Sequence, residues 1–253
     1  MAHVYRRSFA ILSVSILLMA LPGCEEEGPQ GPAGPVLTGD LIGYTILTDL
    51  YGSQVPDRSG VTVTAEGTTI SAVSDSTGRW VLTNLPTGTY TIAYSKTGYG
   101  TRKGMGYQFV GGGQTSYGTT FLYQIPGFTV TGLSAAPSGD NVFLSLTLTG
   151  VLPTATNKYV QVFIGTSAGV SSDPANYRST FSLAIGSAST TFSGDIPSQS
   201  YFHAYGFSAG QTAYVVAYAM GYGSGSYLDL ETGRYWYSSL NPIPSNVDTV
   251  AVP

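Results

Sequence analysis

The sequence has few charged residues, one cysteine and two histidines. Lys, Arg, Asp and Glu make up 9% of the 253 residues, and 10 basic residues against 14 acidic ones give a formal net charge of −4. Nucleic-acid-binding domains carry a clustered basic surface, so we expect no nucleic-acid partner. One cysteine excludes an intramolecular disulfide bond, and so few cysteines and histidines exclude the common structural zinc sites. We therefore expect neither a metal nor a cofactor.

Helical periodicity is also missing after residue 38. Short runs instead alternate apolar with polar residues, and clusters of Gly, Pro, Asp and Ser separate these runs about every 8 to 12 residues. The chain is rich in residues that form turns and strands, with 33 Gly, 14 Pro and 19 Tyr. This pattern predicts an all-β protein with β-sandwich architecture.

The N-terminus has the pattern of an export signal. A positively charged start precedes an apolar run over residues 9–21, which is too short to span a bilayer. The run ends in Leu21, Gly23 and Cys24, and this ending resembles the bacterial lipoprotein signal. The resemblance implies a signal peptide over residues 1–23 and lipid attachment at Cys24, so that the membrane is a partner. A plain secretory peptide with an incidental cysteine is the alternative.

Residues 24–38 are predicted to be an acidic, Gly-Pro-rich spacer. The run Glu25, Glu26 and Glu27 resembles the tag that routes some Bacteroidetes-type lipoproteins to the outer face of the outer membrane. This resemblance implies a surface-exposed envelope protein, while charge alone fits a solvated spacer equally well. Residues 28–35 repeat glycine at every third position, as in collagen, but three triplets are too few for a triple helix. A polyproline spacer of this length would extend roughly 40 Å.

Residues 39–124 are predicted to form a first β-domain. Residues 61–65 alternate between Val or Ala and Thr, and residues 90–94 alternate in the same way. Between them, Asp75 and Gly78 mark a tight turn, since Asp hydrogen-bonds the backbone that follows it and Gly accepts a positive φ. The same turn, like Asp229 with Glu231, lacks the density of acids found in a calcium-binding loop.

This segment resembles the carboxypeptidase regulatory-like family. The motifs that carry the resemblance are Gly43, Val55-Pro56, Gly60-Val61-Thr62-Val63, Ser74-Asp75-Ser76-Thr77-Gly78-Arg79-Trp80, Leu85-Pro86-Thr87-Gly88-Thr89-Tyr90 and Lys96-Thr97-Gly98-Tyr99. The family implies a transthyretin-like sandwich of seven strands, related to Cna B-type domains, with Trp80 and Tyr90 in its core. It also implies an accessory role without catalytic zinc ligands. A self-made isopeptide bond is not expected, because the first strand, residues 40–49, contains no lysine.

Residues 126–253 are predicted to form a second β-sandwich. Residues 208–219 resemble strand F of fibronectin type III domains. In that register Val215, Ala217 and Ala219 point into the core, and the alternate residues Tyr214, Val216 and Tyr218 form an apolar outer face. Such a face needs a cover, either the first domain or a partner. If the strand slides by one residue, Tyr214 is in the core instead.

Catalysis is not expected. His203 is the only histidine that would remain after cleavage of the signal, no nucleophile elbow is present, and the carboxylates are scattered singly. One feature of the sequence stays unexplained by these patterns: tyrosines and a tryptophan gather in and beside Gly- and Ser-rich loops near the C-terminus. The candidate ligand or partner contacts are Tyr214, Tyr218, Tyr222, Tyr227, Tyr235, Trp236 and Tyr237.

These rings would stack on sugars or anchor a protein interface, or they would pack inward in a tyrosine-rich sandwich. The sequence thus favours a non-enzymatic, lipid-anchored adhesion or scaffold module at the cell surface. A glycan-binding lipoprotein of a polysaccharide uptake system is the first alternative. An enzyme of unknown type is the second.

Overall fold

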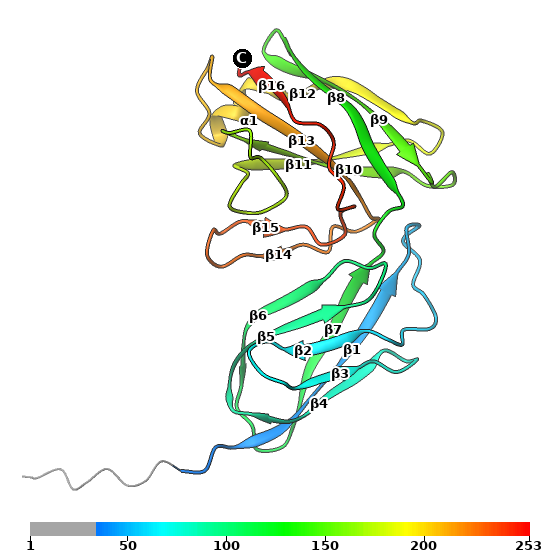
Figure 1. The fold of residues 1–253 in the computed structure, drawn as a ribbon, viewed down its shortest axis with the longest axis vertical. Coiled ribbons are helices and arrows are strands. Elements are labelled where there is room, and N and C mark those ends of the chain that lie inside the picture. The colour runs from blue at the N-terminus through cyan, green and yellow to red at the C-terminus, as the bar shows by residue number, and fades with distance from the viewer. Residues whose placement is uncertain (1–33) are drawn as a thin grey trace, which may run out of the picture. The chain divides into compact units, whose positions relative to one another are not determined.

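The computed structural model describes residues 34–253, and Val36–Pro253 form one compact unit. The predicted signal peptide, Cys24 and most of the predicted spacer lie outside the described residues. The described part is almost entirely β-structure, with two tandem β-sandwiches and one short helix. Figure 1 shows that the chain completes strands β1 to β7 before it enters the second sandwich at β8. The predicted all-β class is therefore confirmed.

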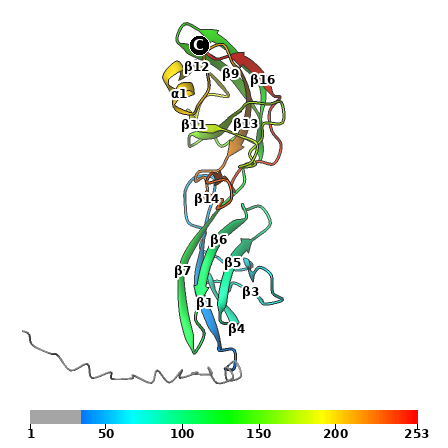
Figure 2. The same ribbon diagram turned by 90° about the vertical axis from the view of Figure 1, so that its left-hand side faces the viewer.

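The first sandwich consists of seven strands in two sheets. Its strands are β1 (Thr38–Thr48), β2 (Thr62–Ala65), β3 (Ser71–Val73), β4 (Arg79–Pro86), β5 (Gly88–Ser95), β6 (Arg102–Phe109) and β7 (Gln114–Tyr123). One sheet has the order β4-β1-β7 and the other β3-β2-β5-β6. All neighbours pair antiparallel except β1 and β7, which run parallel. In the turned view, β7 and β3 lie on opposite sides of this sandwich (Figure 2).

The core of the first sandwich is built around Trp80. This side chain is 1% exposed and meets the ring of Tyr94 edge-on, with 5.7 Å between centroids. Val61 and Val63 are also fully buried, as the alternation predicts. Tyr90 is only partly buried and packs against the cluster from its margin, because its hydroxyl donates to the carbonyl of Pro86. The core role is therefore confirmed for Trp80 and is peripheral for Tyr90.

The predicted turn at Asp75 has the expected chemistry. A carboxylate oxygen of Asp75 accepts from the backbone N–H groups of Thr77 and Arg79 at 2.9 and 3.0 Å. Gly78 has a φ of 87°, a conformation that favours glycine. These hydrogen bonds hold the pKa of the Asp75 carboxyl below its ordinary value, with the Thr77 side chain as the main cause. Asp75 therefore has a structural role in closing the turn into β4.

The second sandwich also has two main sheets. Its strands are β8 (Phe128–Ser138), β9 (Asn141–Gly150), β10 (Lys158–Gly165), β11 (Ser179–Ile185), β12 (Thr191–Ser198), β13 (Thr212–Met220) and β16 (Asp248–Ala251), and β14 (Tyr227–Leu228) and β15 (Tyr235–Trp236) form a separate hairpin. The sheet orders are β11-β10-β13-β16 and β12-β9-β8. Leu144, Leu146 and Leu148 point into the core between them, as predicted.

One helix departs from the expectation of a chain without helices. Helix α1 (Gln199–Ala204) is six residues long and follows β12 directly. It forms because the side chain of Ser198 caps it by accepting from the N–H of Tyr201, and because Phe202 buries its ring in the core. A helix of six residues is too short to produce a detectable helical period in the sequence. His203 lies on this helix and is exposed.

Candidate functional site

The outer face of strands β10 and β13 carries a second hydrophobic cluster. Val215, Ala217 and Ala219 lie in the main core, which confirms the fibronectin-like register of β13. The alternate residues Val216 and Tyr218 are 1% and 6% exposed, and they belong to a separate cluster on the other face of the sheet. The prediction of an apolar outer face is therefore confirmed.

Phe163 of β10 is the centre of this second cluster. Three tyrosine rings surround it, those of Tyr177, Tyr218 and Tyr237, with centroid distances of 5.0, 5.5 and 5.5 Å. Tyr177 precedes β11 and Tyr237 follows β15, so loops of the same sandwich cover the face. The expectation that the first domain or a partner must cover it was wrong. A cover made by distant loops of the same domain leaves no trace in the alternation of β13.

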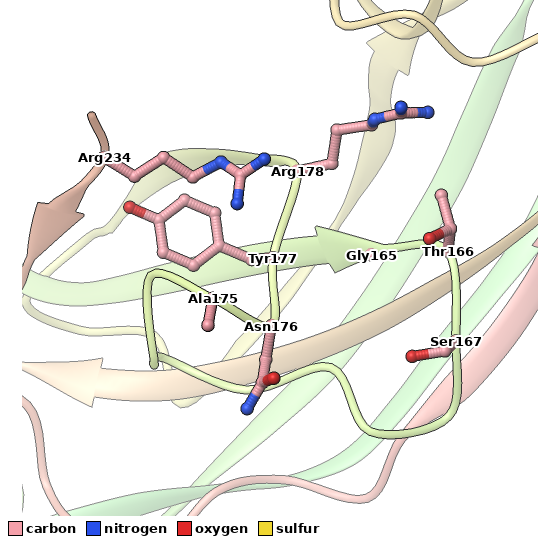
Figure 3. A pocket seen from close by; sticks show the side chains of 8 residues that line it. All are labelled: Gly165, Thr166, Ser167, Ala175, Asn176, Tyr177, Arg178 and Arg234. Carbon is pink, nitrogen blue, oxygen red and sulfur yellow. The ribbon is translucent and has the colours of Figure 1, made fainter. Parts of the chain in front are cut away.

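The hydroxyl of Tyr177 holds the covering loops together through hydrogen bonds. It donates to the carbonyl oxygen of Tyr235 at 2.7 Å and accepts from the N–H of the same residue at 2.9 Å. The guanidinium group of Arg234 lies over the Tyr177 ring, 5.9 Å from its centroid, and donates to the carbonyl of Pro174 at 2.8 Å. Figure 3 shows the Arg234 side chain next to the Tyr177 ring. The β14–β15 hairpin is thus tied to the segment that leads into β11.

A cleft of about 260 Å³ lies beside this junction. Its walls are residues 177–180, Tyr205 after helix α1, and Gly233, Arg234, Tyr235 and Tyr237 of the hairpin. We call it the Tyr–Arg cleft. A second cavity of about 220 Å³ adjoins it and shares Tyr177, Arg178 and Arg234 (Figure 3). Three chain segments that are distant in sequence therefore build one concave surface.

The rings and the arginines of the Tyr–Arg cleft are open to a ligand. Tyr205 and Tyr235 are 45% and 49% exposed. Arg178 is exposed and donates to the carbonyl of Gly206 at 3.0 Å, with its guanidinium 5.6 Å from the centroid of the Phe207 ring. In Figure 3 the Arg178 side chain points away from Tyr177. The cleft thus combines aromatic surface with several hydrogen-bond donors.

Burial keeps the central phenol protonated. Desolvation raises the pKa of Tyr177 to about 12. Burial also raises the pKa of Tyr237 above the ordinary value for tyrosine. At neutral pH the Tyr177 hydroxyl is therefore a stable donor to the carbonyl of Tyr235, and the hairpin position does not depend on pH in that range.

The structure distributes the seven candidate aromatics over several environments. Tyr235 and Tyr237 line the Tyr–Arg cleft, whereas Tyr214 and Tyr218 pack in or against the second cluster. Trp236 pairs with Tyr227 across the hairpin, and both are partly buried. Tyr222 is 49% exposed, and its ring meets that of Tyr159 edge-on at 6.0 Å.

The sequence reasoning found only Tyr235 and Tyr237 among the residues that line the cleft. The aromatic and basic residues that it missed are Tyr177, Arg178, Tyr205 and Arg234. Tyr177 and Arg178 stand together in a loop, and Arg234 adjoins the predicted run of aromatics. A search for basic residues beside exposed aromatics would have found Arg234. Nothing in the sequence links Tyr205 to the hairpin, because the fold of α1 brings it there.

Other candidate chemistry remains separate from the cleft. Within residues 34–253 no three His, Cys, Asp or Glu side chains gather as a metal site. Asp229 accepts from the backbone N–H and the hydroxyl of Thr232, and so it closes the hairpin turn. No helix in the described part of the chain has the length and apolar character needed to cross a membrane.

The comparisons with known proteins agree with the first sandwich. Residues 56–105 match the family model described as the CarboxypepD_reg-like domain. This match confirms, for that segment, the resemblance drawn from its motifs. No curated protein matches the chain.

Several solved structures are similar to the chain in fold. A putative carbohydrate binding protein from Bacteroides uniformis is 18% identical, with 86% of this chain and 100% of that chain covered, at a TM-score of 0.30. A DUF3823 family protein from Bacteroides ovatus is 18% identical, with 87% and 100% covered, at a TM-score of 0.30. A type II cohesin-X-dockerin complex from Acetivibrio cellulolyticus is 27% identical, with 34% of this chain covered, at a TM-score of 0.30. The match spans 58% of that last chain.

Proposed function

We propose that this chain is a non-enzymatic, lipid-anchored protein of the bacterial envelope that binds a glycan in the Tyr–Arg cleft. The observation that carries the proposal is the cleft itself, where the half-exposed rings of Tyr205 and Tyr235 border about 260 Å³ of concave surface. A sugar ring has apolar C–H faces and a rim of hydroxyl groups. Aromatic rings beside hydrogen-bond donors match both parts of such a ligand.

The size of the cleft favours a short part of a longer glycan. Pockets for whole small molecules usually enclose about 300–1,000 Å³, and the Tyr–Arg cleft is slightly smaller, at about 260 Å³. The adjoining cavity continues past Arg178 and Arg234 and offers a second concave surface of about 220 Å³. A polysaccharide that lies across both would place one unit in the cleft and its neighbours beside the arginines.

The backbone of Tyr235 and the ring of Tyr205 are held in place before a ligand arrives. Tyr177 fixes the backbone of Tyr235 through two hydrogen bonds. The ring of Tyr205 packs on that of Tyr201, with 4.7 Å between centroids. Ordering a mobile side chain costs about 0.5–1.5 kcal/mol on binding, so rings already fixed by the fold bind with less loss.

The lipid anchor at Cys24 completes the proposed function. Lipid chains would hold the protein on the envelope, and residues 25–38 would serve as a spacer between the lipid and the folded part. Glycan binding on such a tether would attach the cell to a polysaccharide. Surface adhesion is then a consequence of glycan capture, and adhesion to a protein partner is the competing hypothesis.

Affinity electrophoresis of the detergent-purified full chain through gels containing neutral and acidic polysaccharides tests the proposal. At least one polysaccharide should retard the protein, and Tyr235→Ala should lower the affinity about tenfold or more, since buried aromatic contacts dominate binding energy. Tyr222→Ala is the matched control, because Tyr222 is also 49% exposed but lies outside the cleft. Equal retardation of both variants, or no retardation by any polysaccharide, would contradict glycan binding here.

The non-enzymatic part of the proposal has its own test. It is supported by the regulatory-like match over residues 56–105, since the resemblance implies an accessory domain. Incubation with any retained polysaccharide should release no reducing ends. Release that disappears in His203→Ala would show that the chain is an enzyme.

A further inference from the structure

The Tyr–Arg cleft contains two arginines that lack an acidic partner. Arg178 and Arg234 line both the cleft and the adjoining cavity. Among residues 34–253, Lys103 and Glu66 form the only ion pair. The whole chain has only 10 Lys and Arg and a net charge of −4, and two of these basic residues lie at this one concave surface.

Each guanidinium retains capacity for a ligand. A guanidinium group has five N–H donors in a planar fork. Arg178 uses a donor for the carbonyl of Gly206, and Arg234 uses one for the carbonyl of Pro174. Each guanidinium also lies over an aromatic ring, that of Phe207 for Arg178 and that of Tyr177 for Arg234, and this contact consumes no further donors. Both groups are therefore positioned by the protein and only partly satisfied within the described chain.

Three acids lie closest in sequence, and two of them are committed to turns. The third, Glu231, stands three residues before Arg234, is exposed and forms no ion pair with it. A carboxylate oxygen of Asp173 accepts from the N–H of Ala175. The carboxylate of Asp229 accepts twice from Thr232, which lowers its pKa and keeps it ionised as part of the hairpin turn. Neither acid forms an ion pair with Arg178 or Arg234. Both guanidinium groups thus have no ion-pair partner in the described chain and keep N–H donors for an external anion, while the ionised Asp229 is close enough to Tyr177 to contribute to its raised pKa.

We propose that the glycan bound in the Tyr–Arg cleft is acidic and carries uronate carboxylates that pair with Arg178 and Arg234. The inference rests on the proposed glycan binding and names the class of sugar. A carboxylate is planar and accepts two parallel N–H bonds from a guanidinium fork, which fits arginine better than lysine. Arg234 is partly buried, so its ion pair would be screened less by water than a fully exposed one.

The orientation of the two side chains favours a polymer with repeated charges. Arg234 lies over Tyr177, whereas Arg178 points away from that ring (Figure 3). The two groups therefore suit two separate carboxylates along one chain. Tyr235 and Tyr205 lie at the same concave surface and would stack on the sugar rings between these charges.

A matched pair of ligands tests the inference on the full chain. We would measure binding to polygalacturonan and to the same polymer after its carboxyl groups are reduced to neutral alcohols. The acidic polymer should bind at least about tenfold more tightly, because reduction removes the charge-assisted hydrogen bonds. Arg178→Gln and Arg234→Gln should each weaken binding of the acidic polymer about tenfold, and Arg234→Lys should restore only part of the affinity.

Controls separate this inference from the function on which it rests. Arg79→Gln removes an exposed arginine of the first sandwich and should leave binding unchanged. Equal binding of both polymers would overturn the acidic class but leave glycan binding intact. Binding of neither polymer would overturn the uronate, and retardation by another polysaccharide in the electrophoresis would show that glycan binding itself stands. Tighter binding of a glycan that carries sulfate groups and no carboxylates than of polygalacturonan would overturn the assignment of carboxylates as the groups that the arginines bind. The hydrogen bond of Arg178 goes to Gly206 and not to the hairpin. Arg178→Gln therefore still tests the inference if Arg234→Gln disturbs the fold of the hairpin.

Discussion

Tyr177 and Tyr235 are 58 residues apart, and one phenol hydroxyl satisfies both backbone groups of its partner. It donates to the Tyr235 carbonyl at 2.7 Å and accepts from the Tyr235 N–H at 2.9 Å. The same Tyr177 ring packs on Phe163 and lies under the guanidinium of Arg234. This one side chain therefore joins the second hydrophobic cluster to the cleft that we propose as the binding site.

Tyr177→Phe should weaken the attachment of the β14–β15 hairpin while it keeps the aromatic ring that packs in the second hydrophobic cluster. The variant keeps the ring but leaves the N–H and the C=O of Tyr235 without their partner, so the free energy of unfolding should fall by about 1–3 kcal/mol. Chemical denaturation measures this loss. Tyr90→Phe is the control, because its hydroxyl makes a single hydrogen bond, to the Pro86 carbonyl, and should cost about 1 kcal/mol or less. An equal loss in both variants would contradict the special role of Tyr177.

Alkaline pH should destabilise the protein through its buried phenols. Burial raises the pKa of Tyr177 to about 12, while tyrosine in an unfolded chain titrates near 10. Above pH ~10 the unfolded chain releases its proton and the folded chain retains it, so the stability contributed below that pH is lost as the pH rises to about 12. The free energy of unfolding of Tyr177→Phe should fall less steeply over this range. Parallel curves for the two proteins would argue against the raised pKa.

Gly43→Ala should destabilise the first sandwich. A Cβ at position 43 would overlap the ring of Trp80, which is 1% exposed and cannot move aside. Overpacking of this kind costs about 1–3 kcal/mol, and thermal unfolding would report it. Gly186→Ala is the matched control, since a Cβ there meets nothing within 4 Å and the backbone has no positive φ. Wild-type stability in Gly43→Ala would show that the sheet accommodates the methyl group.

Asn241→Ala should destabilise the second sandwich. The side-chain amide of Asn241 is buried and donates to the carbonyls of Pro126 and Phe128 at 2.9 and 3.0 Å. Removing it leaves buried acceptors without a donor, at a cost of about 1–3 kcal/mol each. Asn246→Ala serves as the comparison, because Asn246 is exposed and its two bonds to the backbone of Leu133 are only partly buried, so water offsets more of the lost amide there than at Asn241. The two variants should differ clearly in denaturation midpoint.

Cys24→Ala should release the protein from the membrane fraction. If Cys24 carries the lipid, the variant should lose incorporation of labelled fatty acid and appear in the soluble fraction, because the acyl chains provide the anchoring energy. Labelling and fractionation of cells that express each form measure this. Retention of the label in Cys24→Ala would place the lipid elsewhere. The binding of polysaccharide by the Tyr–Arg cleft should persist in the released protein.

Local sequence patterns predicted the parts of the fold that depend on near neighbours. Alternation in residues 61–65 predicted which side chains of β2 are buried, and Asp75 with Gly78 predicted a turn. The register of β13 was favoured by the resemblance to strand F, but a shift by one residue stayed open because both faces of this strand are apolar. The structure places Val215, Ala217 and Ala219 in the core. Helix α1 was missed, since its stability comes from one capping serine and one buried ring.

The sequence by itself determined that this is an all-β chain with a regulatory-like segment and an excess of tyrosine near the C-terminus, and it favoured an outward apolar face on β13 without excluding a strand shifted by one residue. Only the tertiary structure decided what covers that face and which tyrosines remain open. The cover depends on Phe163, Tyr177 and Tyr237, and the cleft on Tyr205 as well, and these come from loops and elements far apart in the chain. Such contacts have no periodicity, because each depends on where a loop returns after folding and not on the residues beside it.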